Sequence, residues 1–294
     1  MRYIMTIRHL KVFVAICEYG GVTKAAQALH TAQPSISYTI SEMERHYNIS
    51  LFARINQRLI LTDLGKELLI KAKEILAGFD DFEELASNGT LNVTLRIGSS
   101  LTLGKTILPE YLNKLRNTLP NVSPVVSINK TADIEKELEL GNLDFGIVEG
   151  DVSSPHLCAI TFGGDSIVAV CAKDYPIPDE LNLEELLKYP LLLREVGSAS
   201  RNLFDQALLR NHLSAKPILE SVSNECIIAA LEAGLGVSVL PESLVIHAAR
   251  ENRLKVLTIR DTDFRRNHSL LVHKNKKFSP LQSKALSLCK EMIQ

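Results

Sequence analysis

The segment from residue 63 to residue 87 constrains the fold of this chain more than any other segment. It contains no proline, and apolar side chains recur along it at alternating spacings of four and three residues. Such heptad spacing is typical of a long helix whose apolar stripe pairs with the same helix of a second chain. The stripe consists of Leu68, Ala72, Ile75, Phe79, Phe82 and Ala86.

The same pattern leaves an alternative open, in which the stripe packs against the domain that the helix itself belongs to. The sequence Ser87-Asn88-Gly89 is typical of a helix end and marks a domain boundary. We therefore divide the chain into an N-terminal domain at residues 1–62, a linker and dimerisation helix at 63–88, and a C-terminal domain at 89–294.

The N-terminal domain is expected to begin with three helices. Residues 6–18 carry apolar side chains at helical spacing, and Gly20-Gly21 is expected to end that helix. A short helix is predicted from Lys24 to Leu29, with Thr23 as its N-cap residue. The third helix is predicted at about 32–46, with Thr31 as its cap and Pro34 in the first turn, where a missing N–H costs little.

The two faces of the predicted third helix differ in chemistry. Ile36, Ile40 and Met43 share one face and should pack inward. Two short helices joined by a tight turn, the second with short polar side chains near its N-terminus, are typical of a helix-turn-helix. Backbone N–H groups at that end suit phosphate, and the polar side chains suit base edges. The outward face carries Gln33, Ser35, Ser37, Tyr38 and Ser41.

A short hairpin is expected next, with its tip in the run Arg54-Ile55-Asn56-Gln57-Arg58. Two arginines beside a recognition helix are typical of a DNA-binding wing. Residues 1–62 carry a net charge of +4 although the whole chain carries −1, which favours nucleic acid as a partner. A helical bundle with merely solvated polar groups is the alternative. The residues predicted to contact double-stranded DNA are Thr23, Thr31, Gln33, Pro34, Ser35, Ser37, Tyr38, Arg54 and Arg58.

The whole N-terminal domain resembles that of the LysR-type transcriptional regulators. The resemblance implies a helix-turn-helix at about residues 22–41 and a homodimeric or homotetrameric DNA-binding protein, with RNA polymerase as an expected partner. Two positions depart from the family: Ala32 replaces a frequent serine, which would shift capping to Thr31, and Tyr38 replaces a frequent arginine, which predicts different base contacts. The resemblance rests on Ala25-Ala26, Leu29, Gln33-Pro34-Ser35-Ile36-Ser37, Ile40, Glu44, Leu51-Phe52, Arg54, Arg58, Leu61-Thr62 and Gly65.

Strands and helices alternate in the C-terminal domain. Such alternation implies a parallel sheet with right-handed crossovers. The first set comprises strands at 91–98, 125–128 and 145–148 and helices at 103–119 and 134–140. Further apolar segments follow at 167–171, 183–187, 191–193, 200–209, 217–221, 225–233 and 237–240, then a returning strand at 270–273 and a last helix at 280–292.

This arrangement resembles the two-lobed, periplasmic-binding-protein-like effector domain of the same family. The resemblance implies chain crossings near residues 162–166 and 264–269. Lobe I is expected at about 91–163 and 268–294, and lobe II at about 164–267. The expected fold is therefore an N-terminal all-α winged helix-turn-helix with a linker helix, followed by a two-lobed α/β domain.

Hydroxyl-rich turns follow several of the expected strands. Ligands of open α/β sheets bind beyond the carboxyl ends of strands, and such turns present hydroxyls and backbone N–H groups to anions. Ser, Thr and Asn are also ordinary helix caps, which is the alternative. By resemblance these turns contact the effector, for which we prefer a small anionic metabolite that Arg201 would bind bidentately. The predicted effector contacts are Ser99, Ser100, Thr131, Gly197, Ser198, Ser200, Arg201, Ser223 and Asn224.

Other classes of protein find less support. No segment approaches the ~20 consecutive apolar residues of a membrane span, and the first ten residues carry a helix pattern rather than a signal peptide, so a cytoplasmic location is expected. A secreted solute-binding protein would share the two lobes but would need a signal peptide and no winged head. An enzyme is the main rival, but Glu232-Ala233-Gly234-Leu235-Gly236-Val237 lacks the third glycine of a dinucleotide loop and precedes a strand.

The eight histidines and five cysteines show no spacing typical of metal ligands, and no serine lies in a GxSxG turn. We therefore expect no catalytic residues, no metal and no cofactor. A thiol-based redox sensor is a closer rival, because some relatives carry a cysteine near the turn at 197–201. That turn has no cysteine here, whereas Cys171 and Cys226 are expected in or near the cleft between the lobes.

Overall fold

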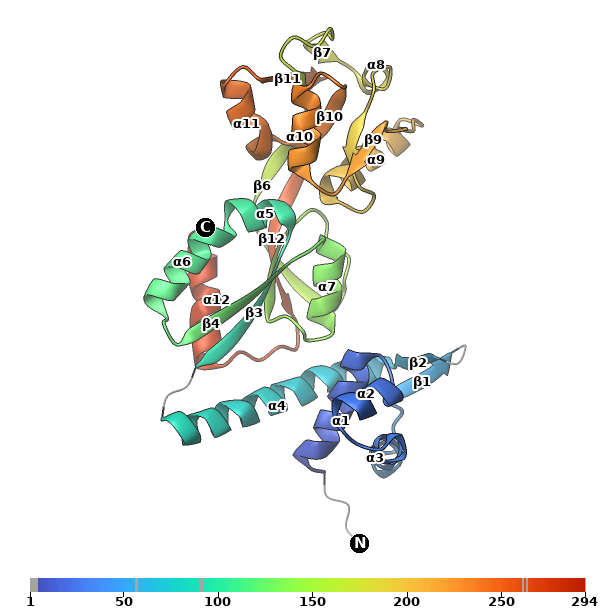
Figure 1. Cartoon of the computed structure of the whole chain (residues 1–294), viewed down its shortest axis with the longest axis vertical. Helices are drawn as coiled ribbons and strands as arrows, with labels where there is room; N and C mark the ends of the chain where they lie inside the picture. The colour runs from blue at the N-terminus through green and yellow to red at the C-terminus, as the bar shows by residue number, and fades with distance from the viewer. Residues whose placement is uncertain (1–4, 56–57, 90–91, 261, 263, 294) are drawn as a thin grey trace.

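The computed structural model describes residues 5–55, 58–89, 92–260, 262 and 264–293. Figure 1 shows a small head, a long helix and two stacked lobes, with the head and the long helix beneath lobe I. The fold expected from the sequence is confirmed: a helical N-terminal domain with a hairpin, called the head below, is followed by a long helix and by two α/β lobes.

The head contains α1 (Ile7–Tyr19), α2 (Val22–Ala28) and α3 (Gln33–Tyr47), followed by the hairpin of β1 (Phe52–Ile55) and β2 (Arg58–Leu61). The predicted helix-turn-helix and hairpin are therefore present. The inward face of α3 packs with α1 and α2 in one core that includes Phe13, Ala25, Ile36, Ile40 and Met43.

Two predicted helix caps are wrong. The N-cap residue of α2 is Gly21, so Thr23 lies inside the first turn of the helix with its side chain exposed. The N-cap residue of α3 is Ala32, and no side chain caps that helix. Thr31 lies one residue too early because its backbone N–H is already bonded to the carbonyl of Ala26, which holds it in the turn between the helices.

Helix α4 spans Asp63–Asn88 without a break. Its N-cap is Thr62, whose hydroxyl accepts from the backbone N–H of Gly65 at 2.9 Å, and it ends at Gly89 in the left-handed conformation. The apolar stripe is divided between two environments: Ala72 is buried in the head core, whereas Ile75 and Phe82 are 51% and 68% exposed. Packing on its own domain therefore accounts for the first part of the stripe only.

Lobe I is built on three parallel strands, β3 (Val93–Ser99), β4 (Val122–Ile128) and β5 (Phe145–Glu149), in the order β4-β3-β5. Helices α6 (Leu108–Thr118) and α12 (Pro280–Ile293) cover one face, and α7 (Thr131–Glu139) covers the other. Each face has its own core, with Tyr111 and Phe145 on one side and Ile134 and Leu138 on the other.

The single helix predicted at 103–119 is wrong. The segment forms two helices, α5 (Leu101–Thr106) and α6, which meet at Ile107 with φ −111°. Pro109 lies in the first turn of α6. A proline has no N–H to donate to the carbonyl four residues earlier, and its ring clashes with that carbonyl, so α5 cannot continue through Pro109 and a second helix begins with the proline in its first turn.

Two long antiparallel strands connect the lobes. They are β6 (Leu157–Ala172) and β12 (Arg265–His273), which pair from Ser166–Arg265 to Leu157–His273. The strands approach so closely that a Cβ on Gly164 would lie 2.4 Å from the carbonyl oxygen of Arg266. Only glycine fits there. The chain crossings are at the positions implied by the family resemblance.

Lobe II extends the far end of β6 with β10 (Val237–Pro241), β11 (Leu254–Ile259) and β7 (Glu180–Leu181). A separate pair, β8 (Leu192–Arg194) and β9 (Leu219–Ser221), runs beside it. Helices α8 (Leu183–Leu186) and α9 (Ala199–Arg210) belong to one side, α10 (Asn224–Glu232) and α11 (Glu242–Arg250) to the other. The sequence reasoning missed α11 and β11.

Candidate functional site

The N-terminal end of α3 presents polar side chains on a rigidly held helix. Gln33, Pro34 and Tyr38 are exposed, Tyr38 by 60%, and Ser35 and Ser37 are half-buried. The Gln33 side-chain amide lies 3.3 Å from the Ser37 hydroxyl, so the two polar groups share one face. Since the opposite face of α3 is locked in the head core, this surface is available to an external partner.

The carboxylate of Glu44 fixes the hairpin relative to α3. Its Oε1 accepts from the backbone N–H of Leu51 at 2.7 Å and of Phe52 at 3.2 Å, at the start of β1. Arg54 is exposed on β1, and Arg58 opens β2 opposite Ile55, with its side chain outside the described residues. The sequence analysis gave Glu44 no role in the structure. Its position near the end of the predicted third helix, shortly before the predicted hairpin, was the available signal for a contact between the two.

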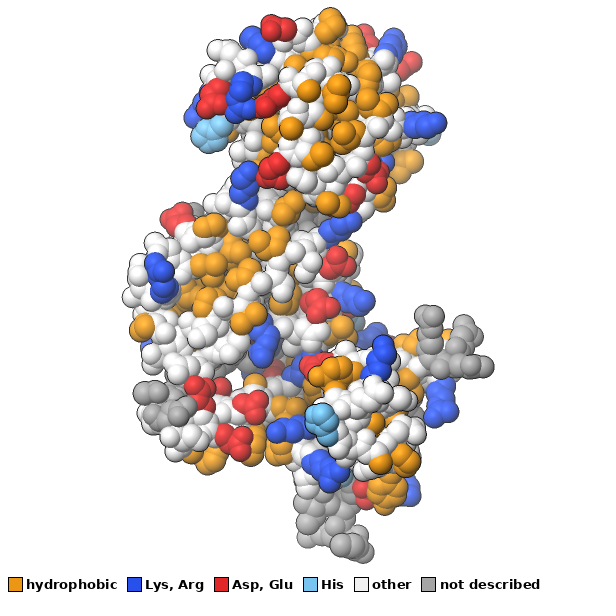
Figure 2. Space-filling model, in the orientation of Figure 1, with side chains coloured by type: hydrophobic (Ala, Val, Ile, Leu, Met, Phe, Trp, Pro, Cys, Tyr) orange, Lys and Arg blue, Asp and Glu red, His pale blue; other side chains and the backbone are white. Residues whose placement is uncertain are grey.

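Charge is unevenly distributed over the lower part of the molecule. Figure 2 shows acidic side chains over the C-terminal part of α4 at the lower left, and several Lys and Arg side chains on the head. The acidic residues of α4 include Asp80, Asp81 and Glu84, and the pKa of Asp81 is raised by partial burial and by the other two carboxylates. A polyanion is therefore favoured at the head and repelled at this end of α4.

The cleft between the lobes holds two adjoining cavities. One, of about 340 Å³, lies between the start of α5 and the start of α9; the other, of about 280 Å³, lies between α7 and α9. Both are lined by Thr131, Glu149 and Ala199. The first is also lined by Ser100, Lys130, Arg194, Glu195, Ser198 and Ser200, and the second by Glu135, Gly197, Asn202 and Arg266.

Glu149 is the central charged residue of the cleft. It ends β5 and is buried, and its carboxylate accepts a hydrogen bond from the Ser100 hydroxyl. Its other oxygen lies 3.2 Å from Nη1 of Arg266 on the crossing strand β12. The Thr131 hydroxyl donates to the Glu149 carbonyl at 2.9 Å, which ties the start of α7 to the same point.

A second carboxylate occupies the lobe II side. Glu195 accepts from Nε of Arg194 at 2.9 Å and lies 3.5 Å from Nζ of Lys130, which comes from lobe I. Lys130 also donates to the Val196 carbonyl at 3.2 Å. Lys130 therefore bridges the two lobes across the mouth of the cleft, and the cations Lys130, Arg194 and Arg266 each face a protein carboxylate.

Five of the nine predicted effector contacts line these cavities: Ser100, Thr131, Gly197, Ser198 and Ser200. Arg201 does not line them. Its side chain is 9% exposed, and its guanidinium contacts Asp205 at 2.9 Å, Glu220 at 3.2 Å and the Arg194 carbonyl at 3.1 Å. Arg201 was predicted to bind an effector anion bidentately, but in this structure these partners hold its guanidinium group inside lobe II.

Three further predicted contacts have structural partners instead. Ser223 is the N-cap residue of α10 and accepts from the backbone N–H of Cys226 at 3.2 Å. Asn224 is buried and accepts from Arg194 at 2.8 Å. The hydroxyl of Ser99 is buried and lies 3.2 Å from the Ser100 carbonyl. The capping alternative thus holds for Ser223, and also for Ser198, whose hydroxyl accepts from the backbone N–H of Arg201 at 3.3 Å at the start of α9.

The charged residues of the cleft were missed. Lys130, Glu149, Arg194 and Glu195 all lie at or just beyond the last residues of strands, at carboxyl ends where ligands of such sheets bind. The same rule that predicts the hydroxyl-rich turns therefore also indicates these charged residues. Arg266 carried no comparable signal, since its place beside Glu149 depends on the crossing of β12 with the sheet of lobe I.

The cysteines give little support to a redox site. Cys171 is buried in lobe II, and burial raises the pKa of its thiol to about 11. Cys226 is exposed on α10 and does not line either cavity of the cleft. Over the described ranges, no three His, Cys, Asp or Glu side chains gather as metal ligands. None of the described helices combines the length and the apolar character that a bilayer span requires.

An apolar groove continues the exposed stripe of α4 onto the head. It forms a cavity of about 460 Å³ between α1, α3 and α4. The groove ends at Ile75, from which the exposed side chains of Phe82 and Leu85 continue along α4. Its lining includes Met5, Leu10, Met43, Tyr47, Leu64, Leu68 and Ile75.

Comparison with known proteins covers both parts of the chain. Residues 7–66 match the family model "Bacterial regulatory helix-turn-helix protein, lysR family", and residues 88–294 match "LysR substrate binding domain". The HTH-type transcriptional regulator YofA of Bacillus velezensis is 31% identical over 237 residues, 80% of this chain and 81% of that protein.

Two solved structures share the fold. A full-length OxyR variant from Pseudomonas aeruginosa is similar with a TM-score of 0.68 and 22% identity, over 99% of this chain and 95% of that one. The regulatory domain of CcmR from Synechocystis, in complex with 2-PG, is similar with a TM-score of 0.62 and 21% identity, over 68% of this chain and 97% of that one.

Proposed function

Because the chain belongs to the LysR family of transcriptional regulators, we propose that α3 enters the major groove of an operator and reads base edges there. The protein is a sequence-specific DNA-binding regulator with a C-terminal effector-binding domain. The exposed polar end of α3, held by the buried Ile36 and Ile40, is the observation that supports this role. Its reading residues are Gln33, Ser35, Ser37 and Tyr38.

The hairpin is proposed to contact the DNA backbone. Arg54 is exposed on β1, and Glu44 holds the start of that strand on α3. Arg58 opens the paired strand. Arginine beside a recognition helix neutralises phosphate and positions the helix without reading sequence. Pro34 lies in the first turn of α3. We propose that Thr23 and Thr31 contact the phosphates that flank the bases read by α3.

The effector is proposed to be a small anion that also carries a hydrogen-bond donor. The backbone N–H groups at the start of α9 and the ammonium of Lys130 suit an anionic group. Glu149 faces the same space as a buried acceptor, and a second fixed negative charge is unfavourable beside it. A ligand hydroxyl, amine or protonated acid would meet this acceptor. The 2-PG complex of CcmR, a domain of the same fold, supports a ligand of small size.

We propose that two chains pair through α4, whose exposed Ile75, Phe82 and Leu85 continue into the apolar groove of the head. A dimer holds two α3 helices at a fixed separation on two half-sites. Effector binding between the lobes regulates only if the ligand prefers one arrangement of the heads, typically by ~1–3 kcal/mol. We further propose that the DNA-bound protein contacts RNA polymerase and that it acts in the cytoplasm.

Fluorescence anisotropy tests the DNA-binding role. The purified chain is titrated onto DNA from upstream of its own gene and onto scrambled DNA, over a series of salt concentrations. We expect selective binding that weakens steeply as salt rises. Equal affinity for both DNA molecules, together with failure of genome-wide fragment selection to enrich a site, would contradict this role.

The same assay screens for the effector. Simple carboxylates and inorganic phosphate are compared with hydroxylated carboxylates, phosphate esters and amino acids of similar size. We expect a compound with both an anionic group and a donor to change the operator affinity at least ~fivefold. A response to simple anions alone would contradict the role given to Glu149 while leaving the DNA-binding role intact.

A further inference from the structure

We propose that Lys73 is a positioning residue that seats the DNA-binding head on lobe I of its own chain. The proposal goes beyond DNA and effector binding, because it assigns the contact through which the two domains hold one orientation. Without such a contact, the head would be joined to lobe I only by the short connection between α4 and β3.

Lys73 projects from α4 and contacts three parts of the molecule. Its Nζ donates to the Leu140 carbonyl at 2.9 Å and to the side-chain oxygen of Asn142, both in the turn after α7. It also lies 3.5 Å from the Glu18 carboxylate near the end of α1, in the head. The Lys73 side chain is only 16% exposed. One ammonium group therefore joins head, linker helix and lobe I.

Further contacts of the turn at 140–142 surround the Lys73 ammonium, beside a cavity of about 450 Å³ between α4 and lobe I. Leu140 packs against the core of the head. Gly141 has φ +66°, and a Cβ there would lie 3.5 Å from Cδ of Lys73 and 3.6 Å from Cγ1 of Ile70. The Asn142 amide is oriented by its bond to Glu137 at 2.7 Å, so its oxygen faces Lys73. The turn at 140–142 is thus shaped to receive α4.

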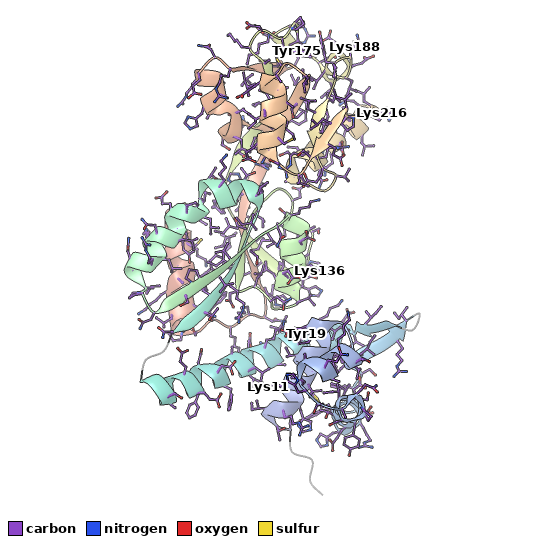
Figure 3. The ribbon with its side chains drawn as sticks, in the orientation of Figure 1. Lys11, Tyr19, Lys136, Tyr175, Lys188 and Lys216 are labelled. Atoms are coloured by element: carbon purple, nitrogen blue, oxygen red, sulfur yellow. The ribbon has the colours of Figure 1, made fainter. Side chains whose placement is uncertain are left out.

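A second turn of lobe I touches the same side of α4. Lys71 donates to the Asn275 carbonyl at 2.9 Å, and Glu74 accepts from the backbone N–H of Lys277 at 2.8 Å. In Figure 3, Lys136 on α7 and Tyr19 at the end of α1 mark the two parts that meet over α4. Two separate turns therefore fix α4 against rotation as well as sliding.

Helix α7 connects this junction to the effector cleft. Its first residue, Thr131, lines both cavities and donates to the Glu149 carbonyl, and the turn that follows its last residue contacts Lys73. With 9 residues, α7 spans about 13 Å. A shift at the cleft end of this rigid helix would move the Leu140 carbonyl and so the seat of the head.

Lys73 has its positive charge in a partly buried place. Burial lowers the pKa of its ammonium, and the Glu18 carboxylate opposes that effect. A partly desolvated ammonium requires its full set of acceptors. This requirement makes the contact specific for one relative placement of head and lobe, rather than a general adhesion between two surfaces.

Hydrogen exchange of the full-length protein, without DNA or effector, tests the junction directly. In Lys73→Met we expect amide exchange in residues 139–144 to rise roughly tenfold relative to the wild type, with exchange in β3 and β5 unchanged. Lys66→Met is the matched control, since Lys66 lies on the same helix but pairs with Asp63 within α4. Wild-type exchange at 139–144 in Lys73→Met would overturn the proposal.

Asn142→Ala removes one acceptor from the lobe I side and leaves the head sequence intact. We expect it to raise exchange over residues 70–77 of α4 as well, and a lack of change there would count against the junction even if Lys73→Met failed to fold. Thr131→Val perturbs the cleft end of α7. As a single substitution it should raise amide exchange at residues 139–144 about twofold. Added to Lys73→Met, it should cause no further rise, because the contact that carries the effect is already lost. Because these measurements need no operator, their failure is distinct from failure of the DNA-binding role.

Discussion

Ser100, the N-cap residue of α5, donates its hydroxyl hydrogen bond to the carboxylate of Glu149 at the end of β5. A serine at the start of a helix after a strand was expected to receive an effector anion. The protein's own carboxylate takes that place instead, and Arg266 of the crossing strand binds the other oxygen at 3.2 Å. The cleft therefore already holds a fixed negative charge before any ligand binds.

Replacing Glu149 with glutamine should change which ligands the cleft accepts. Glu149→Gln keeps the shape of the side chain and removes one negative charge beside Lys130 and the start of α9. We expect simple carboxylates to bind roughly tenfold more tightly, about 1.4 kcal/mol, and to lose their disadvantage against hydroxylated ones. Isothermal titration calorimetry with both classes measures the change.

Glu110→Gln is the control for that experiment, because Glu110 is exposed in the first turn of α6, outside both cavities. It should leave the ligand preference as in the wild type. If Glu149→Gln binds simple carboxylates no more tightly than the wild type does, the charge of Glu149 has no part in discriminating between simple and hydroxylated carboxylates.

Sequence reasoning predicted the head well because its signals are local. The spacing of Ile36, Ile40 and Met43 was enough to orient α3, and all three are buried. The caps failed because a shift of one or two residues in a helix start changes which side chain can reach the free N–H groups. The break at Ile107 was equally local, but the consequence of Pro109 was overlooked.

Partners distant in sequence explain most of what was missed. Arg201 was predicted to bind the effector, although Asp205 lies one helical turn away and its spacing indicates an ion pair. Its second partner, Glu220, belongs to β9 and carried no signal. Likewise, nothing in the sequence links Lys73 with Asn142, since their contact depends on how α4 lies against lobe I.

Single substitutions in the head should separate base reading from backbone binding. Gln33→Ala is expected to relax discrimination at one base position by about 1–3 kcal/mol, because Gln33 lies exposed at the start of α3. Arg54→Ala should weaken binding to all sequences alike and reduce the salt slope by about one, and the same is expected of Arg58→Ala. Anisotropy on a set of point-substituted operators measures both. An unchanged base preference in Gln33→Ala would refute its reading role.

Glu44→Gln should loosen the hairpin. The variant weakens two backbone hydrogen bonds to a charged acceptor, at Leu51 and Phe52, and a loss of about 1–3 kcal/mol is expected. Hydrogen exchange at residues 50–55 should rise, and operator affinity should fall because Arg54 is less well positioned. Glu42→Gln is the control on the same helix, since the Glu42 carboxylate lies 3.7 Å from His9 of α1 rather than at the hairpin. Equal effects of the two variants would contradict the anchor.

Asp165 should make the hinge between the lobes sensitive to acid. Burial alone would raise the pKa of Asp165, but the hydrogen bonds from Arg266 and the proximity of the His268 ring at 3.4 Å lower it from 3.8 to about 2. The pKa of Asp165 is lower in the folded state than in the unfolded state, so its ionised form stabilises the fold. This contribution to the free energy of unfolding, about 2 kcal/mol, is complete above about pH 4 and is lost as the pH falls from about 4 to 2. Thermal unfolding at several pH values should therefore show a steeper loss for the wild type than for Asp165→Asn. Parallel curves would rule out this contribution.

The exposed part of the α4 stripe should control self-association. Phe82 is 68% exposed and follows Ile75 by one heptad, so Phe82→Glu would place two like charges in the seam of a paired helix. We expect sedimentation analysis to show the variant at a lower oligomeric state than the wild type, and its operator affinity to fall because two half-sites are no longer bound together. Glu67→Gln, at an exposed position outside the stripe, should behave as the wild type does. If Phe82→Glu sedimented like the wild type, pairing would have to use another surface.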